Sequence, residues 1–371
     1  MKRVCLLIIA VSLLLSGCAS LFDGTYISTT PHRPQNSQTV TDDVLASNYD
    51  ELYAALVNMA QNGMQTGLIH IPQYKLDVVE KDMEEAVSTA MRRDPITAYA
   101  VETITWELGS SGQRAIAVNI EYIHDRSEIR KIREVADIES ATEVILSEVL
   151  NASAGVVLYI QDYRKTDFVK MVEEYAFDNP QLVIETPQIT ENIYPKYGVS
   201  RVVELKFGFK TDREELKLMK SRVNGTFSSA KGYVRDDAQD RQKLFQLYSF
   251  LMERFDEYTI ETSITPAFSL LWYGIGDSKA FATMYAALCR AEGLDCQVIR
   301  GTRDGEPWYW NLVKENDRYY HVDLPRSSAL GMFQMLTDGQ MQGYVWHYEA
   351  YPSCPDEQPE PTGTIPGSTG T

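Results

Sequence analysis

Three residues in the last third of the chain have side chains of the types used in nucleophilic catalysis. Ser278 lies where a predicted helix begins, and His321 and Asp323 lie two residues apart on a predicted strand. A hydroxyl as nucleophile, an imidazole that takes its proton and a carboxylate that orients the imidazole would together form a hydrolase. This enzyme is the alternative hypothesis for the site.

The elements around these residues follow from apolar spacing and turn chemistry. A Ser at position 278 can cap the first turn of a helix, and Gly293 ends that helix. Its buried face is indicated by apolar residues at helical spacing: Ala280, Phe281, Met284, Ala287 and Leu288. Strands are predicted over 296–302, 308–314 and 318–323, and the last two flank the hairpin pair Asn316-Asp317.

This order of elements, with the segments CQVIRGT, WNLV and YYHVD, resembles the core of the transglutaminase-like superfamily, which has a papain-like fold. Active members carry a Cys at the helix start, a His on the first hairpin strand and an Asp at the end of the second. The resemblance places these roles on Ser278, Trp308 and Asp323, so that only the Asp is kept. It implies a catalytically defective domain over 236–351, in which a core helix packs on an antiparallel sheet.

The predicted register brings Trp308 next to Asp323. If the hairpin turns at Asn316-Asp317, Asp323 lies opposite Trp310 and diagonal to Trp308 on the same face. An indole only donates a hydrogen bond, and losing a general base costs roughly 10²–10⁴ in rate. We therefore expect no catalytic residues, and expect Asp323 to bond the Trp308 indole or the backbone. His321 remains the alternative base, with Ser278 and Asp323, although related active domains often carry a His there too.

Aromatic residues are concentrated around these positions. Trp272, Trp308, Tyr309 and Trp310 are candidates for a binding surface that stacks on a peptide or a sugar. The other interpretation is that they are buried core. Because the sequence contains no Cys-x-x-Cys and no cluster of histidines, we expect neither a metal site nor a cofactor.

The N-terminal segment predicts export and attachment to a membrane. Residues 1–17 carry two basic residues and then an apolar run, as in a signal peptide, and Leu15-Ser16-Gly17-Cys18 resembles the lipobox of bacterial lipoproteins. We expect a lipid on Cys18, a flexible tether over 18–47 and an extracytoplasmic location. The alternatives are an ordinary secretory signal and, for the tether segment, a first strand of the next domain. A net charge of −17 argues against nucleic acid as a partner.

Residues 48–227 predict a duplicated α/β region. The order α-β-α-β-β occurs over about 48–134 and again over about 138–222, and we expect the two halves to join their sheets. A polar link over 228–240 and a disordered tail over 352–371 complete an α+β chain. His70, His124 and the carboxylates Glu102, Glu107 and Glu121 are interpreted as surface or structural residues of this region.

Three cysteines, Cys289, Cys296 and Cys354, remain after Cys5 and Cys18, and the sequence leaves their pairing open. The prediction is a lipid-anchored surface protein whose inactive transglutaminase-like domain binds or scaffolds a protein, a peptide or a wall glycan. A purely structural spacer is a further alternative.

Overall fold

The computed structural model describes residues 43–109, 114–259 and 264–356. The predicted signal peptide, Cys18, the tether up to residue 42 and the tail from 357 lie outside these residues. The described residues from Val44 onward belong to one unit. None of the helices within the described ranges combines the length and apolarity needed to cross a bilayer.

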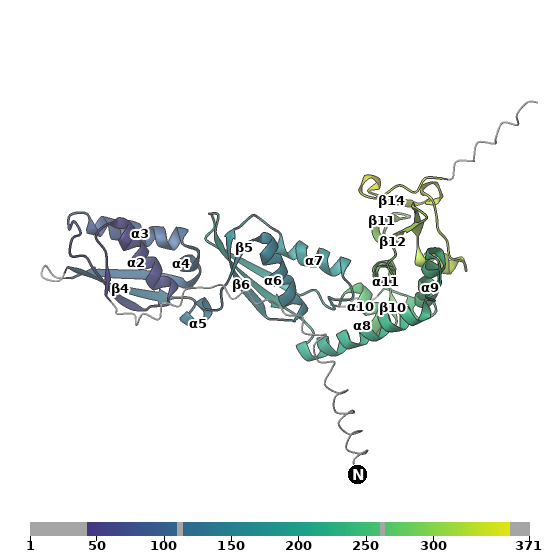
Figure 1. Ribbon diagram of the computed structural model, residues 1–371, viewed down its shortest axis with the longest axis horizontal. Helices are drawn as coiled ribbons and strands as arrows, with labels where there is room; N and C mark the ends of the chain where they lie inside the picture. Colours follow the sequence, from purple (N-terminus) through teal and green to yellow (C-terminus); the bar gives the residue numbers. More distant parts are fainter. Residues whose placement is uncertain (1–42, 110–113, 260–263, 357–371) are drawn as a thin grey trace, which may run out of the picture. The chain divides into compact units, whose positions relative to one another are not determined.

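The first α/β unit contains one four-stranded sheet (Figure 1), with strand order β1-β2-β4-β3. Its elements are β1 (Asp43–Leu45), α2 (Tyr49–Gln61), β2 (Thr66–His70), α3 (Val79–Arg93), α4 (Pro95–Ala100), β3 (Val101–Leu108), β4 (Ala115–Tyr122) and α5 (Arg126–Ile129). Apolar side chains of α2 and α3 pack against the sheet. Because β1 is a strand and Ala46 is buried, the predicted tether ends before residue 43 rather than at 47.

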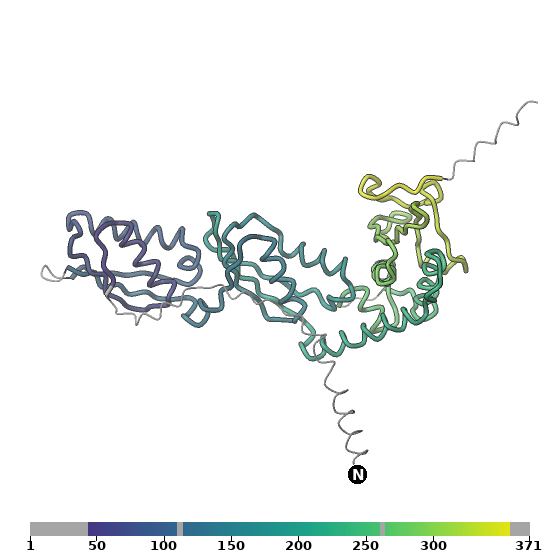
Figure 2. Tube along the Cα trace, viewed as in Figure 1, coloured from purple at the N-terminus to yellow at the C-terminus, as the bar shows by residue number. Residues whose placement is uncertain are grey.

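The second α/β unit has its own four-stranded sheet, in the order β5-β6-β8-β7. Its elements are β5 (Arg133–Asp137), α6 (Ile138–Leu150), β6 (Gly155–Asp162), α7 (Phe168–Asp178), β7 (Gln188–Tyr194) and β8 (Arg201–Gly208). The expectation that the two halves join their sheets is therefore wrong. The two strand orders correspond position by position, while the proposed duplication stays a prediction. Figure 2 follows the chain through both units, from purple to teal.

A long helix replaces the predicted polar link. Helix α8 (Arg213–Tyr233) begins at Asp212, whose carboxylate accepts bonds from the backbone N–H groups of Glu214 and Glu215. Leu216, Met219 and Val223 are buried at helical spacing and pack against Ile264 and Phe268. The polar composition of 228–240 reflects the exposed side of α8 and the short turn that follows it, so the link prediction is wrong.

The C-terminal domain is built around one buried helix. It contains α9 (Asp240–Met252), β9 (Asp256–Glu257), α10 (Pro266–Tyr273), β10 (Ile275–Gly276), α11 (Ser278–Ala291), β11 (Cys296–Arg303), β12 (Glu306–Glu315), β13 (Arg318–Val322), α12 (Leu324–Ala329), β14 (Tyr344–Trp346) and two 3₁₀ turns, η1 (Asp338–Gln340) and η2 (Tyr348–Ala350). Helix α11 packs on an antiparallel sheet of order β13-β12-β11-β14. The predicted α+β fold with a core helix on an antiparallel sheet is confirmed.

The hairpin register is the one that the turn signal predicts. Glu315 pairs with Arg318, and Asn316 and Asp317 both have positive φ. At the other edge of the sheet, Gly301 lets β14 approach β11 closely. A Cβ there would lie 2.3 Å from the Val345 carbonyl oxygen and 2.7 Å from the Trp310 ring. The domain also extends past the predicted tail boundary at 352, because Cys354 is fully buried.

Candidate active site

Helix α11 starts with an Asp cap rather than a Ser cap. The Asp277 carboxylate accepts the backbone N–H of Ala280 at 2.9 Å, which makes Asp277 the N-cap and Ser278 the first helical residue. The capping role expected for Ser278 is therefore wrong. Its hydroxyl points instead toward strand β12, where Oγ accepts the backbone N–H of Tyr309 at 3.3 Å. Ser278 is buried, with 5% of its surface exposed.

The Asp323 carboxylate is held entirely by donors. Oδ2 accepts the indole N–H of Trp308 at 2.8 Å and the hydroxyl of Tyr344 at 2.6 Å. Oδ1 accepts the backbone N–H of Arg326 at 3.0 Å, and the Arg303 guanidinium lies 3.9 Å from Oδ2. Both contacts that the sequence predicted for Asp323, one to the indole and one to backbone, are present. Burial, and then the negative charge of Asp323, raises the pKa of the Tyr344 hydroxyl, which therefore stays a donor.

His321 is engaged in another direction. Its Nδ1 accepts the indole N–H of Trp310 at 3.0 Å, so in the neutral ring the proton resides on Nε2 and is donated to Asp338 Oδ1 at 2.9 Å. The imidazole is 1% exposed, and burial lowers its pKa against the opposing effect of Asp338. Because both ring nitrogens are occupied, His321 does not form the predicted alternative triad with Ser278 and Asp323.

The structure brings together a group that the sequence did not indicate. Ligand atoms of His321, Asp338 and Cys354 lie within 4.8 Å of one another. The donor set does not suit a metal ion. His321 Nδ1 already accepts the Trp310 indole N–H, so Nε2 could bind a metal only by losing its proton, which would leave the imidazole as an anionic imidazolate. Burial and Asp338 raise the pKa of the Cys354 thiol to about 12, which keeps it neutral. The Asp338 backbone N–H also donates to the Cys354 carbonyl at 2.7 Å, and the Cys354 N–H donates to Asp338 Oδ2 at 2.8 Å, so the cluster fastens the C-terminal segment to the sheet.

The four aromatic residues predicted to bind a ligand do not form one surface. Trp310 is fully buried in a core with Tyr344 and Trp346, so its predicted binding role is wrong. Trp272 lies on α10, packed beside Phe268 with the Arg222 guanidinium 4.3 Å from its ring. Trp308 faces Asp323, and alternation along β12 turns Tyr309 toward the opposite side.

Tyr309 faces a cavity of about 570 Å³ that we call the α7 cleft. Its lining comes from α7, the segment after α7, the start of α10, α11, β11 and β12: Lys170, Glu173, Glu174, Ala176, Phe177, Pro180, Thr186, Thr265, Pro266, Ala267, Lys279, Thr283, Arg300 and Tyr309. Ser278, Trp308 and Asp323 are not among them. Sequence reasoning missed this cleft because its two walls come from segments about 100 residues apart, and only Tyr309 had been singled out.

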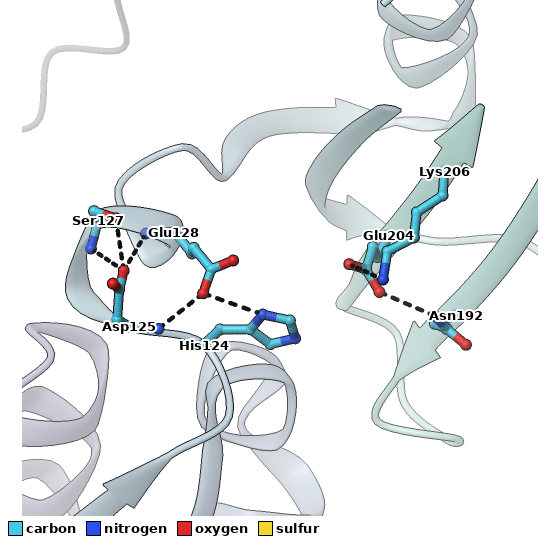
Figure 3. Close-up of polar contacts among 7 residues, drawn as sticks. All are labelled: His124, Asp125, Ser127, Glu128, Asn192, Glu204 and Lys206. Atoms are coloured by element: carbon cyan, nitrogen blue, oxygen red, sulfur yellow. Dashed lines mark hydrogen bonds and ion pairs between the residues drawn. The ribbon is translucent and has the colours of Figure 1, made fainter. Parts of the chain in front are cut away.

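The first two units offer polar groups that are explained by structure (Figure 3). His124 follows β4 rather than lying on it, stacks on Tyr99 with ring centroids 4.1 Å apart, and has Nδ1 3.5 Å from Glu128. Glu204 is buried and receives bonds from Asn192 and Lys206. The three carboxylates interpreted as surface or structural residues are exposed on the sheet: Glu102, Glu107 and Glu121.

Comparison with known families supports the C-terminal topology. Residues 228–324 match the model of the transglutaminase-like superfamily. No curated protein matches the chain. The match begins within α8 and ends just after Asp323, so it spans the core helix and the hairpin described above.

Three solved structures are similar to parts of the chain. One, described as a TGase, has 9% identity and a TM-score of 0.25, covering 56% of this chain and 61% of its own. A putative cysteine protease from Cytophaga hutchinsonii has 12% identity and a TM-score of 0.25, covering 43% of this chain and 70% of its own. A putative protease from Parabacteroides distasonis has 6% identity and a TM-score of 0.23, covering 45% of this chain and 39% of its own. The chain thus spans less than two thirds of the TGase.

Proposed function

We propose that the transglutaminase-like domain at 228–324 has lost its chemistry and serves as a binding or scaffolding module. The observation that carries this proposal is the hydrogen bond from Trp308 Nε1 to Asp323. The carboxylate that would orient a catalytic imidazole accepts instead from a group that cannot take a proton. The nucleophile position is filled by Ser278, whose hydroxyl accepts a backbone N–H.

The two replacements act on the same chemical step. A thiol has a pKa near 8.5 and is partly ionised at neutral pH, whereas a Ser hydroxyl needs a neighbouring base to attack. The residue in the base position is Trp308, and the imidazole of His321, the alternative base, is bound to Trp310 and Asp338. Among the described residues, these features leave the Ser278 hydroxyl without an imidazole bonded to it that could take its proton.

The proposal includes a location. A lipid on Cys18 would attach the protein to the outer face of a bacterial cell membrane, with the folded units held away from it by the tether. A protein, a peptide or a wall glycan would then be within reach. Anchoring by acyl chains suits this chain, because its net charge of −17 would be repelled by anionic headgroups. Metabolic labelling with an alkyne fatty acid, abolished by Cys18→Ala, would support this location.

An activity-based probe tests the loss of chemistry. We expect a fluorophosphonate to leave the full-length protein unlabelled under conditions that label a serine hydrolase added as an internal control. Labelling that disappears in Ser278→Ala would establish the alternative, a hydrolase that uses Ser278, and would overturn the proposal.

Restoring the ancestral residue types gives a second test. The double variant Ser278→Cys with Trp308→His places a thiol at the start of α11 and an imidazole beside Asp323. We expect its thiol to react with iodoacetamide near neutral pH at least tenfold faster than the thiol of Ser278→Cys alone, because a neighbouring imidazolium stabilises the thiolate. Equal rates in the two variants would mean that the three positions do not form a catalytic geometry.

A further inference from the structure

The α7 cleft is a built cavity whose walls are fixed to each other. On one side lie α7 and the segment that follows it, and on the other lie α10, α11 and strands β11 and β12. Thr265 donates its backbone N–H to the Ile184 carbonyl at 2.7 Å and its hydroxyl to the Val183 carbonyl at 3.0 Å. Arg290 of α11 donates to the Asp178 carbonyl at 2.6 Å. These bonds connect the two walls of the cleft.

Two cationic side chains in this cleft, Lys279 and Arg300, lie over aromatic rings. The Arg300 guanidinium lies 3.8 Å from the centre of the Phe177 ring, and the Lys279 ammonium lies 5.8 Å from the same ring. Lys279 is also 5.5 Å from the Tyr309 ring. Within the described parts of the chain, neither cation forms an ion pair with a carboxylate. Both therefore remain available to an anionic group that enters from solvent.

The opposite wall carries charge of the other sign. Glu174 lies 3.7 Å from Lys170 one turn earlier on α7, and Glu173 beside it is exposed. After the Lys170–Glu174 pair is set aside, the lining keeps the two cations and the single carboxylate of Glu173. A net positive cavity is unusual on a chain whose formal charge is −17, and charge complementarity favours an acidic ligand.

We propose that the α7 cleft binds an acidic peptide segment, with a carboxylate placed between Lys279 and Arg300. This inference rests on the proposed binding function and names its ligand class. Stacking of a sugar ring is less suited to the cleft, because Arg300 already covers a face of Phe177 at 3.8 Å. A guanidinium held over an aromatic ring can still present its N–H edge to a carboxylate. The cavity volume, about 570 Å³, falls in the range of small-ligand sites.

Fluorescence anisotropy with two labelled peptides tests the inference on the full-length chain in detergent. One probe is fluorescein-Gly-Glu-Phe-Glu-Gly, and the other replaces both Glu residues by Gln. We expect the acidic probe to bind at least tenfold more tightly than the amide probe, and the difference to shrink as salt is raised. Equal affinities for the two probes, or no binding of either at millimolar concentration, would overturn the proposal.

Three variants locate the binding in the cleft. Lys279→Gln with Arg300→Gln should weaken the acidic probe at least tenfold, whereas Glu173→Gln should tighten it because a repelling carboxylate is removed. Lys81→Gln with Arg130→Gln makes the same change in net charge at exposed positions of the first unit and should leave affinity within twofold. An equal loss in the cleft variant and in this control would show that the probe responds only to overall charge.

The same samples separate this inference from the proposed function. Mass spectrometry of the probe after incubation reports cleavage or deamidation. Unchanged probe with charge-dependent binding supports both proposals. Modified probe would overturn the loss of chemistry and leave the cleft assignment standing, whereas absent binding with unmodified probe would overturn the cleft assignment alone.

Discussion

The indole N–H of Trp308 donates a 2.8 Å hydrogen bond to the carboxylate of Asp323, which is 1% exposed. In Trp308→Phe this buried carboxylate keeps Tyr344 and the Arg326 N–H as donors but loses one bond. A hydrogen bond to a charged group contributes about 1.5–3 kcal/mol, and an unsatisfied buried acceptor costs a similar amount. We therefore expect the free energy of unfolding, measured in urea, to fall by about 1.5–3 kcal/mol.

A matched substitution separates the hydrogen bond from the size of the ring. Trp346→Phe removes the same atoms from a half-buried indole in the same aromatic cluster, which contacts Trp310 and His321 by ring packing. We expect it to cost less than Trp308→Phe. If the two variants lost equal stability, the bond to Asp323 would not be what makes Trp308 important.

The start of α11 provides the second prediction. Asp277 caps the helix through Ala280 N–H, whereas the Ser278 hydroxyl makes one long bond to strand β12. Loss of an N-cap side chain costs about 0.5–2 kcal/mol, so Asp277→Ala should destabilise the protein by that amount in urea unfolding. Ser278→Ala should reduce the free energy of unfolding by less. If Ser278→Ala were the more destabilising of the two, Ser278 rather than Asp277 would be the residue that caps the helix.

The parts of this site that the sequence predicts are those fixed by local rules. Asn316 and Asp317 tolerate the positive φ that a two-residue hairpin needs, so they set the pairing of Glu315 with Arg318. From that register follow the alternation along β12 and the meeting of Trp308 with Asp323. One turn signal thus predicts a side-chain contact between Trp308 and Asp323, which are 15 residues apart, because strand geometry has a period of two.

The parts that the sequence does not predict depend on distant segments. Helix α8 has apolar residues at 216, 219 and 223, but its Ser, Gly and Lys residues on the exposed side gave the appearance of a link. The contacts of His321 with Asp338 and Cys354 join a strand to a short 3₁₀ turn and to the irregular C-terminal segment, which carry no apolar periodicity that could be read from the sequence. Trp310 and Trp308 occupy the same face, and the packing of β14 and of the segments around it, which include Leu336, Met341 and Cys354, makes one buried and leaves the other half-exposed.

Cysteine pairing is the third prediction. Cys289 on α11 and Cys296 on β11 are both buried in the same core, and burial, followed by the neighbouring Cys296, raises the pKa of the Cys289 thiol. Cys354 belongs to a different core. If the protein is oxidised outside the cytoplasm, we expect the Cys289–Cys296 bridge and a free Cys354.

Peptide mapping after alkylation without reductant measures this pairing. The expected product is a linked peptide that contains Cys289 and Cys296, with Cys354 alkylated once the protein is unfolded. Cys354→Ser serves as the control and should leave the linked peptide unchanged. A bridge that involves Cys354 would contradict the prediction, because it would require the two cores to come apart.

The buried His321 predicts a loss of stability in mild acid. Burial lowers its pKa in the folded protein below the ordinary value of 6.5, so the folded state favours the neutral ring. As pH falls through 6.5 the unfolded chain binds a proton that the folded protein still excludes, and stability decreases until the folded-state pKa is reached. Stability from this group is therefore complete above pH 6.5, and its slope below that value is at most about 1.4 kcal/mol per pH unit.

Urea unfolding at several pH values between 8 and 4, for the native chain and for His321→Gln, isolates this contribution. Gln can accept from Trp310 and donate to Asp338, but it lacks the buried ring that packs against Trp310 and Trp346, so the variant should be less stable at pH 8. Because Gln does not titrate, the variant should also lose less stability in acid. The difference between the two proteins should therefore narrow as pH falls below 6.5. A difference that stays constant over this range would mean that His321 does not sense pH, and one that widens would mean that the folded protein favours the charged ring.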